Sequence, residues 1–202
     1  MILIVDYGLG NLGSIQNMLK KVGENSIISS RKEDILKADK IILPGVGAFD
    51  TGINNLRKLD IVDSLNYKAL TDKIPFLGIC LGMQLMCNSS VEGSSKGLSW
   101  FDANLIRFDT KLGLKVPHMN WSYTKILKSS QLFYNMPEEM KFYHVHSYYI
   151  ENKPDISILE SDYHGFKFIS ALQRDNLFGV QFHPEKSHKY GMILLDNFAN
   201  KI

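Results

Sequence analysis

The first half of the chain alternates short apolar runs, rich in β-branched residues, with stretches whose apolar residues recur every three or four positions. The short runs have the length and composition of buried strands, and the longer stretches have the periodicity of amphipathic helices. Strands are predicted at 2–7, 25–30, 40–45 and 74–80, and helices at 11–22 and 31–39. This alternation is typical of an α/β protein in which helices cover both faces of a parallel sheet.

The second half, from about residue 100, has shorter runs joined by Gly, Pro, Asn and Asp. The runs ANLIRF, FYHVHSYYI, FISALQ and LFGVQF predict additional strands and hairpins. The chain closes with an amphipathic stretch at 190–202, which predicts a last helix. We expect the added strands to extend a mixed central sheet, so that residues 1–202 form a single domain.

Composition and charge narrow the possible partners. A chain of 202 residues that is 45% apolar can bury one good core. Its 23 basic and 21 acidic residues leave a formal charge of +2, which is too small to indicate a nucleic acid or a membrane surface as partner. The first residues, MILIVDYG, do not resemble a signal peptide, and no apolar run approaches the roughly 20 residues of a membrane span. We therefore expect a cytoplasmic protein.

A cysteine between two glycines, in GICLG at 78–82, is the first candidate for chemistry. It ends a predicted strand and precedes a predicted helix, and Gly78 and Gly82 lack the side chains that would obstruct so sharp a turn. Such a turn exposes the sulfur of Cys80, and the helix N-terminus behind it favours the thiolate. The backbone N–H of Leu81 is then a natural oxyanion donor. The motif alone is equally compatible with a packed turn and an inert thiol.

The second cysteine does not change this interpretation. Cys87 is seven residues from Cys80, on the helix that the turn opens, so a disulfide between the two is geometrically unfavourable. We expect two reduced thiols.

A base for the cysteine is available in FGVQFHPEKS, where a predicted strand ends at His183. His183 and Glu185 flank a proline in an extended stretch, so both side chains point the same way and Glu185 can orient the imidazole. A chain turn with a surface carboxylate is the simpler alternative, and a metal pair lacks a third ligand nearby. His144 and His146 have the spacing of zinc ligands on a strand, but no cysteine or acid cluster supports them.

Taken together, GICLGMQ around Cys80, LPGVGAF at 43–49 and GVQFHPEKS at 179–187 resemble the class I (triad) glutamine amidotransferase family. DYGLGN at 6–11, KVPHMNW at 115–121 and HVHSYY at 144–149 narrow the resemblance to the glutaminase subunits of imidazole glycerol phosphate synthase. The resemblance covers the whole chain. It implies a flavodoxin-like fold with a mixed central sheet and helices on both faces, and it implies no cofactor and no metal.

The resemblance also implies a reaction, the hydrolysis of L-glutamine to glutamate and ammonia. Cys80 would attack the side-chain amide, His183 would protonate the departing ammonia and then activate water, and Glu185 would orient His183. The remaining residues that the family pattern implies serve the oxyanion and the substrate. The N–H of Leu81 and that of Val46 or Gly47 would form the oxyanion hole, and Gln84, Ser147 and Tyr148 would bind glutamine.

The family pairs this subunit with a (β/α)₈-barrel cyclase. Ammonia would pass to the barrel, which makes imidazole glycerol phosphate and an aminoimidazole carboxamide ribotide in histidine biosynthesis. The positions that match the barrel-facing surface are Asn11, Met119, Trp121 and Lys186. The chain departs from the family pattern near this surface, where it reads HMNWS in place of HMGWN and has Gly13 in place of a basic residue.

Three alternatives remain open at this point. A paralogous glutaminase could supply ammonia for amidation of a surface-polysaccharide sugar, and changed interface residues would suit that role. A synthetase-type or anthranilate-type amidotransferase subunit is disfavoured by DYGLGN and HVHSYY. A non-catalytic scaffold is disfavoured because Cys80, His183 and Glu185 are all present. Gln84 and Tyr148 could also be ordinary helix-face and strand residues, and Trp121 could belong to the core.

Overall fold

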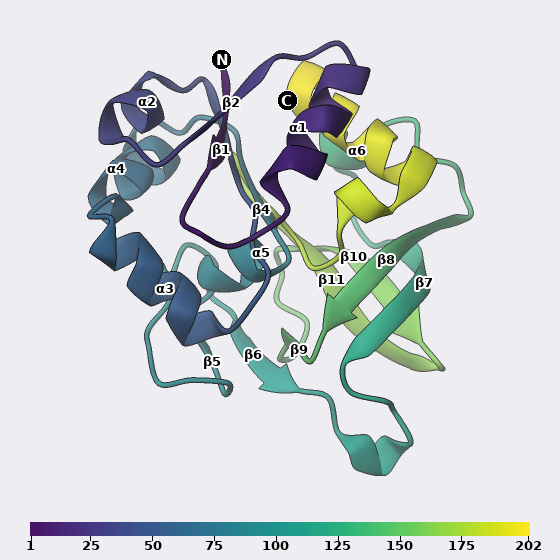
Figure 1. Ribbon diagram of the computed structural model, residues 1–202. Helices are drawn as coiled ribbons and strands as arrows, with labels where there is room; N and C mark the ends of the chain where they lie inside the picture. The colour runs from purple at the N-terminus through teal and green to yellow at the C-terminus, as the bar shows by residue number, and fades with distance from the viewer.

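The computed structural model describes residues 1–202, which are built around a nine-stranded mixed sheet (Figure 1). Its parallel half contains the four strands predicted in the first half of the chain and one strand from near the C-terminus. Each of the four is two or three residues shorter than predicted. In spatial order the strands are β2 (Ser26–Ser29), β1 (Ile2–Val5), β3 (Lys40–Leu43), β4 (Phe76–Ile79) and β12 (Leu177–Val180). This is the flavodoxin-like order of a doubly wound sheet, with β12 as its fifth strand.

The other half of the sheet is antiparallel and comes from the second half of the chain. From β12 outward its strands are β11 (Phe166–Arg174), β10 (Ser157–Tyr163), β7 (His118–Ile126) and β8 (Met140–His146). The expected mixed central sheet is therefore confirmed, although the long strand β7 and its neighbour β10 were not predicted from the sequence.

Helices cover both faces of the parallel half, as predicted. α1 (Leu12–Lys21) and α6 (His188–Asn200) lie side by side on one face (Figure 1). The other face carries α2 (Lys32–Lys37), α3 (Phe49–Lys58), α4 (Val62–Asn66) with a π-helical turn at Tyr67–Thr71, and α5 (Leu81–Leu85). Leu3 packs into the core beneath the second group and Ile4 into the core beneath the first. This is the two-residue alternation of a strand buried on both faces.

One prediction for the second half is wrong. The run ANLIRF forms β6 (Asn104–Arg107), but this strand does not join the main sheet. It pairs with β5 (Ser89–Ser90) and β9 (Tyr148–Ile150) in a separate three-stranded sheet. The chain bends at Ser147, so that β9 turns away from β8, and Leu105 and Ile150 are buried in the core below.

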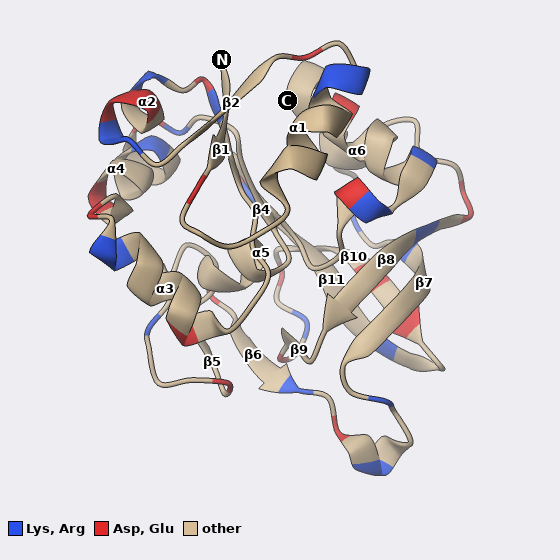
Figure 2. Cartoon of the chain, in the orientation of Figure 1, with Lys and Arg blue, Asp and Glu red and all other residues tan.

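Charged residues are spread over the molecule. Figure 2 shows Lys and Arg interspersed with Asp and Glu on the outer helices and loops, as expected for a formal charge of +2. No helix combines the length and the apolar character that a membrane crossing requires. Short 3-10 turns at Thr110–Leu112, Gln131–Phe133 and Pro184–Lys186 complete the architecture.

Candidate active site

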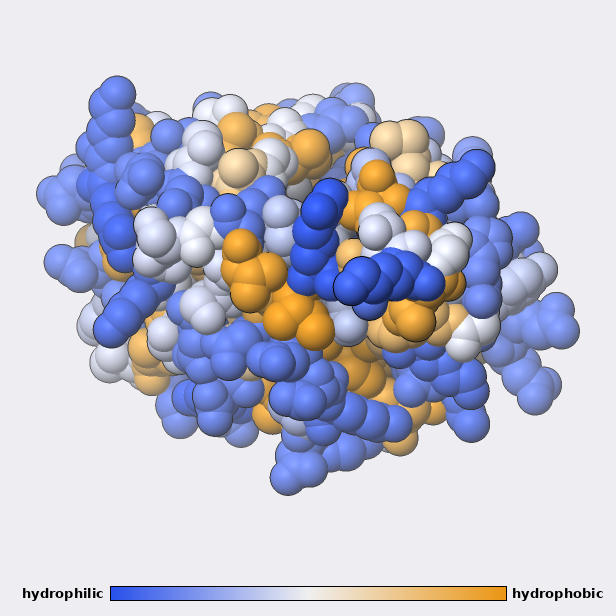
Figure 3. Space-filling model, turned by 90° about the horizontal axis from the view of Figure 1, so that it is seen from below, coloured by the Kyte–Doolittle hydropathy of each residue, from blue (hydrophilic) through white to orange (hydrophobic).

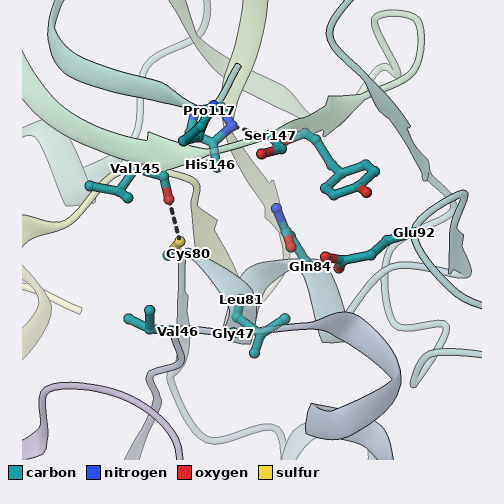
Figure 4. Close-up of a pocket in the computed structure, with 11 residues that line it drawn as sticks. Val46, Gly47, Cys80, Leu81, Gln84, Glu92, Pro117, Val145, His146 and Ser147 are labelled. Carbon is teal, nitrogen blue, oxygen red and sulfur yellow. Dashed lines mark hydrogen bonds between the residues drawn. The ribbon is translucent and has the colours of Figure 1, made fainter.

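Cys80 lies in a strained turn between β4 and α5. Its backbone has φ 52° and ψ −110°, a left-handed conformation that residues other than glycine rarely adopt and that clusters at functional sites. A Cβ on Gly82 would collide with the carbonyl group of Leu43, and one on Gly78 with the backbone of Met83. The expectation that both glycines allow strand and helix to approach closely is confirmed. The turn places the Cys80 sulfur at the wall of a cavity (Figure 4).

His183 approaches the same point from the neighbouring strand. β12 pairs in parallel with β4, so both strands end at one edge of the sheet, and His183 follows β12 by three residues. Its Nδ1 lies 2.8 Å from Oε1 of Glu185, and both side chains are only 2% exposed. Burial lowers the pKa of His183, but the neighbouring Cys80 sulfur and then Glu185 more than offset it and raise the pKa to about 10. The structure therefore joins imidazole and carboxylate by a hydrogen bond, while Nε2 of His183 makes no hydrogen bond and the ring lies near enough to the Cys80 sulfur to be influenced by its charge.

The cavity in front of Cys80 has a volume of about 190 Å³. This is below the roughly 300–1,000 Å³ of sites for drug-sized ligands and suits a molecule of amino-acid size. Seven of the residues that the sequence marked lie on its wall, namely Cys80, Leu81, Val46, Gly47, Gln84, Ser147 and Tyr148. His183 and Glu185 are not among the residues of the wall.

Glu92 also lines this cavity, and sequence reasoning missed it. In Figure 4 its carboxylate faces Gln84 on one side of the cavity, away from the Cys80 sulfur. Its Oε2 accepts a hydrogen bond of 2.8 Å from the N–H of Phe49 at the start of α3. The loop that carries it is pinned because Asp50 accepts hydrogen bonds from the N–H groups of Ser94 and Ser95. Glu92 supplies a fixed negative charge to the cavity that Cys80 also lines.

The turn Pro44–Gly47 packs against the elbow and adds Val46 and Gly47 to the cavity wall, and its backbone occupies one of the two expected oxyanion donors. The N–H of Leu81 donates to the carbonyl oxygen of Gly45 at 3.3 Å. The N–H groups of Val46 and Gly47 donate to no backbone carbonyl, and both residues are exposed. The Tyr7 hydroxyl holds this turn by donating to the Pro44 carbonyl at 2.6 Å. In this state the N–H of Leu81 is not free to bind an oxyanion.

A cluster of three histidines supports the wall that carries Ser147. Ring nitrogens of His118, His144 and His146 lie within 4.8 Å of one another, and all three side chains are buried. Nδ1 of His146 must carry a proton, because it donates to the Tyr148 carbonyl at 2.8 Å. Its Nε2 then accepts from Nδ1 of His144 at 3.0 Å, so these facing nitrogens are joined by a hydrogen bond. Burial lowers the pKa of His146 to about 3, which keeps the ring neutral.

The four residues marked for a partner surface are exposed or half-buried, and none of them lines the cavity. Asn11, Met119 and Lys186 are exposed, and Met119 is 59% exposed. Trp121 is half-buried, with its ring stacked on His188 at 5.6 Å between centroids, so it is not a core residue. Figure 3, which views the molecule from the edge where the parallel strands end, shows apolar groups exposed between hydrophilic ones near the centre of this face.

Comparisons with known proteins agree with this geometry. The family model for glutamine amidotransferase class-I matches residues 3–202. The chain is 50% identical to imidazole glycerol phosphate synthase subunit HisH 2 of Methanococcus maripaludis, with all of both chains covered. It is 46% identical to subunit HisH 2 of Pseudomonas aeruginosa, again over the full length of both. It is also 42% identical to subunit HisH of Bdellovibrio bacteriovorus over 98% of this chain and 99% of that one.

Solved structures share the fold at much lower identity. The structure of PurLQS from Thermotoga maritima superposes with a TM-score of 0.75 at 19% identity, covering 99% of this chain and 97% of that one. A structure described as glutamine amidotransferase gives a TM-score of 0.72 at 15% identity, covering 96% and 99%. By its full-length relatives and its family model, the chain belongs to the class I glutamine amidotransferase family.

Proposed function

We propose that this chain is the glutaminase subunit of an imidazole glycerol phosphate synthase, and that it hydrolyses L-glutamine to glutamate and ammonia. One observation carries the proposal. His183 is hydrogen-bonded to Glu185 and lies near Cys80, whose sulfur faces a small cavity lined also by Gln84 and Glu92. Full-length relatives named as HisH subunits of this synthase support it. These relatives do not favour the alternative of a glutaminase that serves a surface-polysaccharide pathway.

The reaction follows from the three groups. The Cys80 thiolate attacks the side-chain amide carbon of glutamine, and the protonated His183 gives its proton to the departing nitrogen, so that ammonia leaves and a thioester forms. His183, now neutral, takes a proton from water, and the resulting hydroxide attacks the thioester. The C–S bond then breaks, glutamate leaves, and the imidazolium–thiolate pair is restored. Glu185 stabilises the imidazolium and fixes its orientation.

Substrate binding uses the far side of the cavity. Glu92 would pair with the α-ammonium group of glutamine and Gln84 would bind the amino-acid end beside it, while the backbone at Ser147 and Tyr148 would bind its carboxylate. This arrangement directs the side-chain amide toward Cys80.

Catalysis requires a change in the Pro44–Gly47 turn. The oxyanion that forms on the amide carbon needs the N–H of Leu81, which Gly45 now occupies, together with an N–H of Val46 or Gly47. A turn that moves only when the partner holds its own substrate would keep the glutaminase nearly idle until ammonia can be used. The isolated chain should then hydrolyse glutamine far more slowly than the complex does.

The partner is a (β/α)₈-barrel cyclase that forms a heterodimer with this chain. Ammonia released into neutral water is largely protonated and no longer nucleophilic, so a sealed route into the barrel is required. Asn11, Met119, Trp121 and Lys186 would face the barrel, with Trp121 as the main anchor. In this proposal residues 1–202 act as one domain, in the cytoplasm.

The experiment that tests the function uses the complex with its barrel partner. Cys80→Ala should abolish imidazole glycerol phosphate formation from glutamine while leaving formation from added ammonium salts intact. Glutamine-dependent turnover by this variant would show that Cys80 is not the nucleophile. Loss of ammonia-dependent turnover as well would show that the substitution had damaged the assembly instead.

A further inference from the structure

Gln181 is a buried polar residue for which neither the sequence motifs nor the catalytic triad supplies a role. It lies between β12 and His183, is fully buried, and its backbone N–H donates to the carbonyl of Ser170 at 2.9 Å. Its side chain points toward the elbow, where its Nε2 lies 3.6 Å from the Cys80 sulfur. Its Oε1 accepts a hydrogen bond of 3.0 Å from Nε2 of Gln84.

The carboxamides of Gln181 and Gln84 form a hydrogen-bonded pair, and in the arrangement of the structure the nitrogen end of Gln181 faces the sulfur. The oxygen and nitrogen of a carboxamide are distinguished by their hydrogen-bond partners. Because the Gln181 oxygen is used by Gln84, its NH₂ group is turned to Cys80. An N–H donor stabilises a thiolate, whereas the reversed carboxamide would present an oxygen, which favours the protonated thiol. Gln84 itself lines the glutamine cavity, so it joins the cavity to Gln181.

Few other donors are available to this sulfur. α5 is only five residues long, and its first N–H, that of Leu81, is directed at Gly45. The Val145 carbonyl lies 3.8 Å from the sulfur, and a carbonyl can only accept a hydrogen bond from the thiol (Figure 4). His183 is therefore the one cationic neighbour, and the Gln181 amide is the neutral donor that complements it.

We propose that Gln181 is a further catalytic residue, which donates a hydrogen bond to the Cys80 thiolate, and that Gln84 positions its carboxamide for this task. The inference rests on the proposed role of Cys80 as nucleophile. It gives Gln84 a second role beside substrate binding, because any change in the orientation of its carboxamide also changes which atom of Gln181 faces the sulfur.

The test measures the rate at which iodoacetamide alkylates Cys80 as a function of pH in the full chain. Cys87 does not interfere, because it is fully buried and burial raises its pKa to about 12. Cys80→Ala gives the background. The critical variant is Gln181→Met, which keeps the length of the side chain and removes the amide. Gln173→Met, a carboxamide of β11 outside the cavity, is the matched control.

We expect Gln181→Met to move the midpoint of the alkylation profile upward by about one pH unit, with about tenfold slower alkylation at pH values below the midpoint and an unchanged rate at high pH. Gln173→Met should leave the midpoint in place. A midpoint that does not move in folded Gln181→Met, or a rate lowered equally at every pH, overturns the proposal because either result indicates a structural role only.

Gln84→Met tests the proposal independently if Gln181→Met does not fold. It should move the midpoint in the same direction by a smaller amount, because Gln181 remains but is no longer anchored. An unmoved midpoint in folded Gln84→Met would overturn the positioning role. Alkylation requires no glutamine and no partner, so failure here is distinguishable from failure of the proposed function, which Cys80→Ala tests in the complex.

Discussion

The two walls of the cavity differ in how firmly the chain holds them. The elbow at Cys80 is enclosed, since Gly78 and Gly82 leave no space for a Cβ and the Cys80 N–H donates to Val180 at 2.7 Å. The turn Pro44–Gly47 is held less firmly at its tip, because Val46 is 45% exposed and its N–H donates to no backbone carbonyl. The Cys80 sulfur and the occupied N–H of Leu81 thus lie on the elbow, the fixed wall, and the N–H groups of Val46 and Gly47 lie on the turn Pro44–Gly47, the movable wall. Such a site can be complete in its side chains and still inactive.

The largest expected effect comes from disturbing the fixed wall. Gly82→Ala would drive a methyl group into the Leu43 carbonyl, and the backbone on both sides has no room to yield. We expect a loss of about 3 kcal/mol in the free energy of unfolding, measured by urea denaturation, together with loss of glutaminase activity.

The control is Gly13→Ala in α1, where an added Cβ would meet nothing within 4 Å. This substitution should stabilise the chain by about 0.5 kcal/mol, because alanine has the higher helix propensity. Equal free energies of unfolding for the two variants would mean that the elbow tolerates a methyl group as well as an open helix position does. The elbow would then not be the more firmly held wall.

A smaller effect is expected at Glu92, which lies on the cavity wall away from the sulfur. Glu92→Gln keeps an oxygen for the Phe49 N–H but removes the negative charge. We expect the KM for glutamine to rise about tenfold, with a lesser change in kcat, because a charge-assisted hydrogen bond to the substrate is weakened. Steady-state kinetics of the complex measures both, and Glu24→Gln, a half-buried carboxylate outside the cavity, serves as control. A fall in kcat at unchanged KM would contradict the assigned role.

The smallest effect is expected from loosening the movable wall. Tyr7→Phe removes the hydrogen bond to the Pro44 carbonyl that holds the turn. We expect the free energy of unfolding to fall by about 1 kcal/mol. The basal glutaminase rate of the isolated chain should rise about fivefold, because the hydrogen bond that favours the resting conformation of the turn is lost. Reduced stability with an unchanged basal rate would show that Tyr7 supports the fold without holding the turn in its resting state.

Much of the fixed wall could be predicted from the sequence. The apolar run at 2–7 indicated a buried strand, and the GICLG spacing indicated the strand-to-helix turn that the structure contains. These features are local, because neighbouring residues determine both the periodicity of a strand and the space available in a tight turn.

The features that escaped prediction depend on distant contacts. Glu92 reaches the cavity only because Asp50 pins its loop, and no periodicity in SSVEGSSKG indicates this. The run at Asn104–Arg107 has the composition of a strand, but its choice of sheet depends on the bend at Ser147. The occupied N–H of Leu81 depends likewise on a contact with Gly45, which is distant in the sequence.

The central claim is that the Cys80 sulfur and the His183 imidazole form an interacting pair, and titration of His183 by NMR tests it most directly. Because the pair raises the pKa of His183 to about 10, the ring should stay protonated through neutral pH and lose its proton only in alkaline solution. In Cys80→Ala the midpoint should fall by more than about one unit, since the larger of the two raising influences is gone. A midpoint near the ordinary value of about 6.5 that is unchanged by Cys80→Ala would contradict the account.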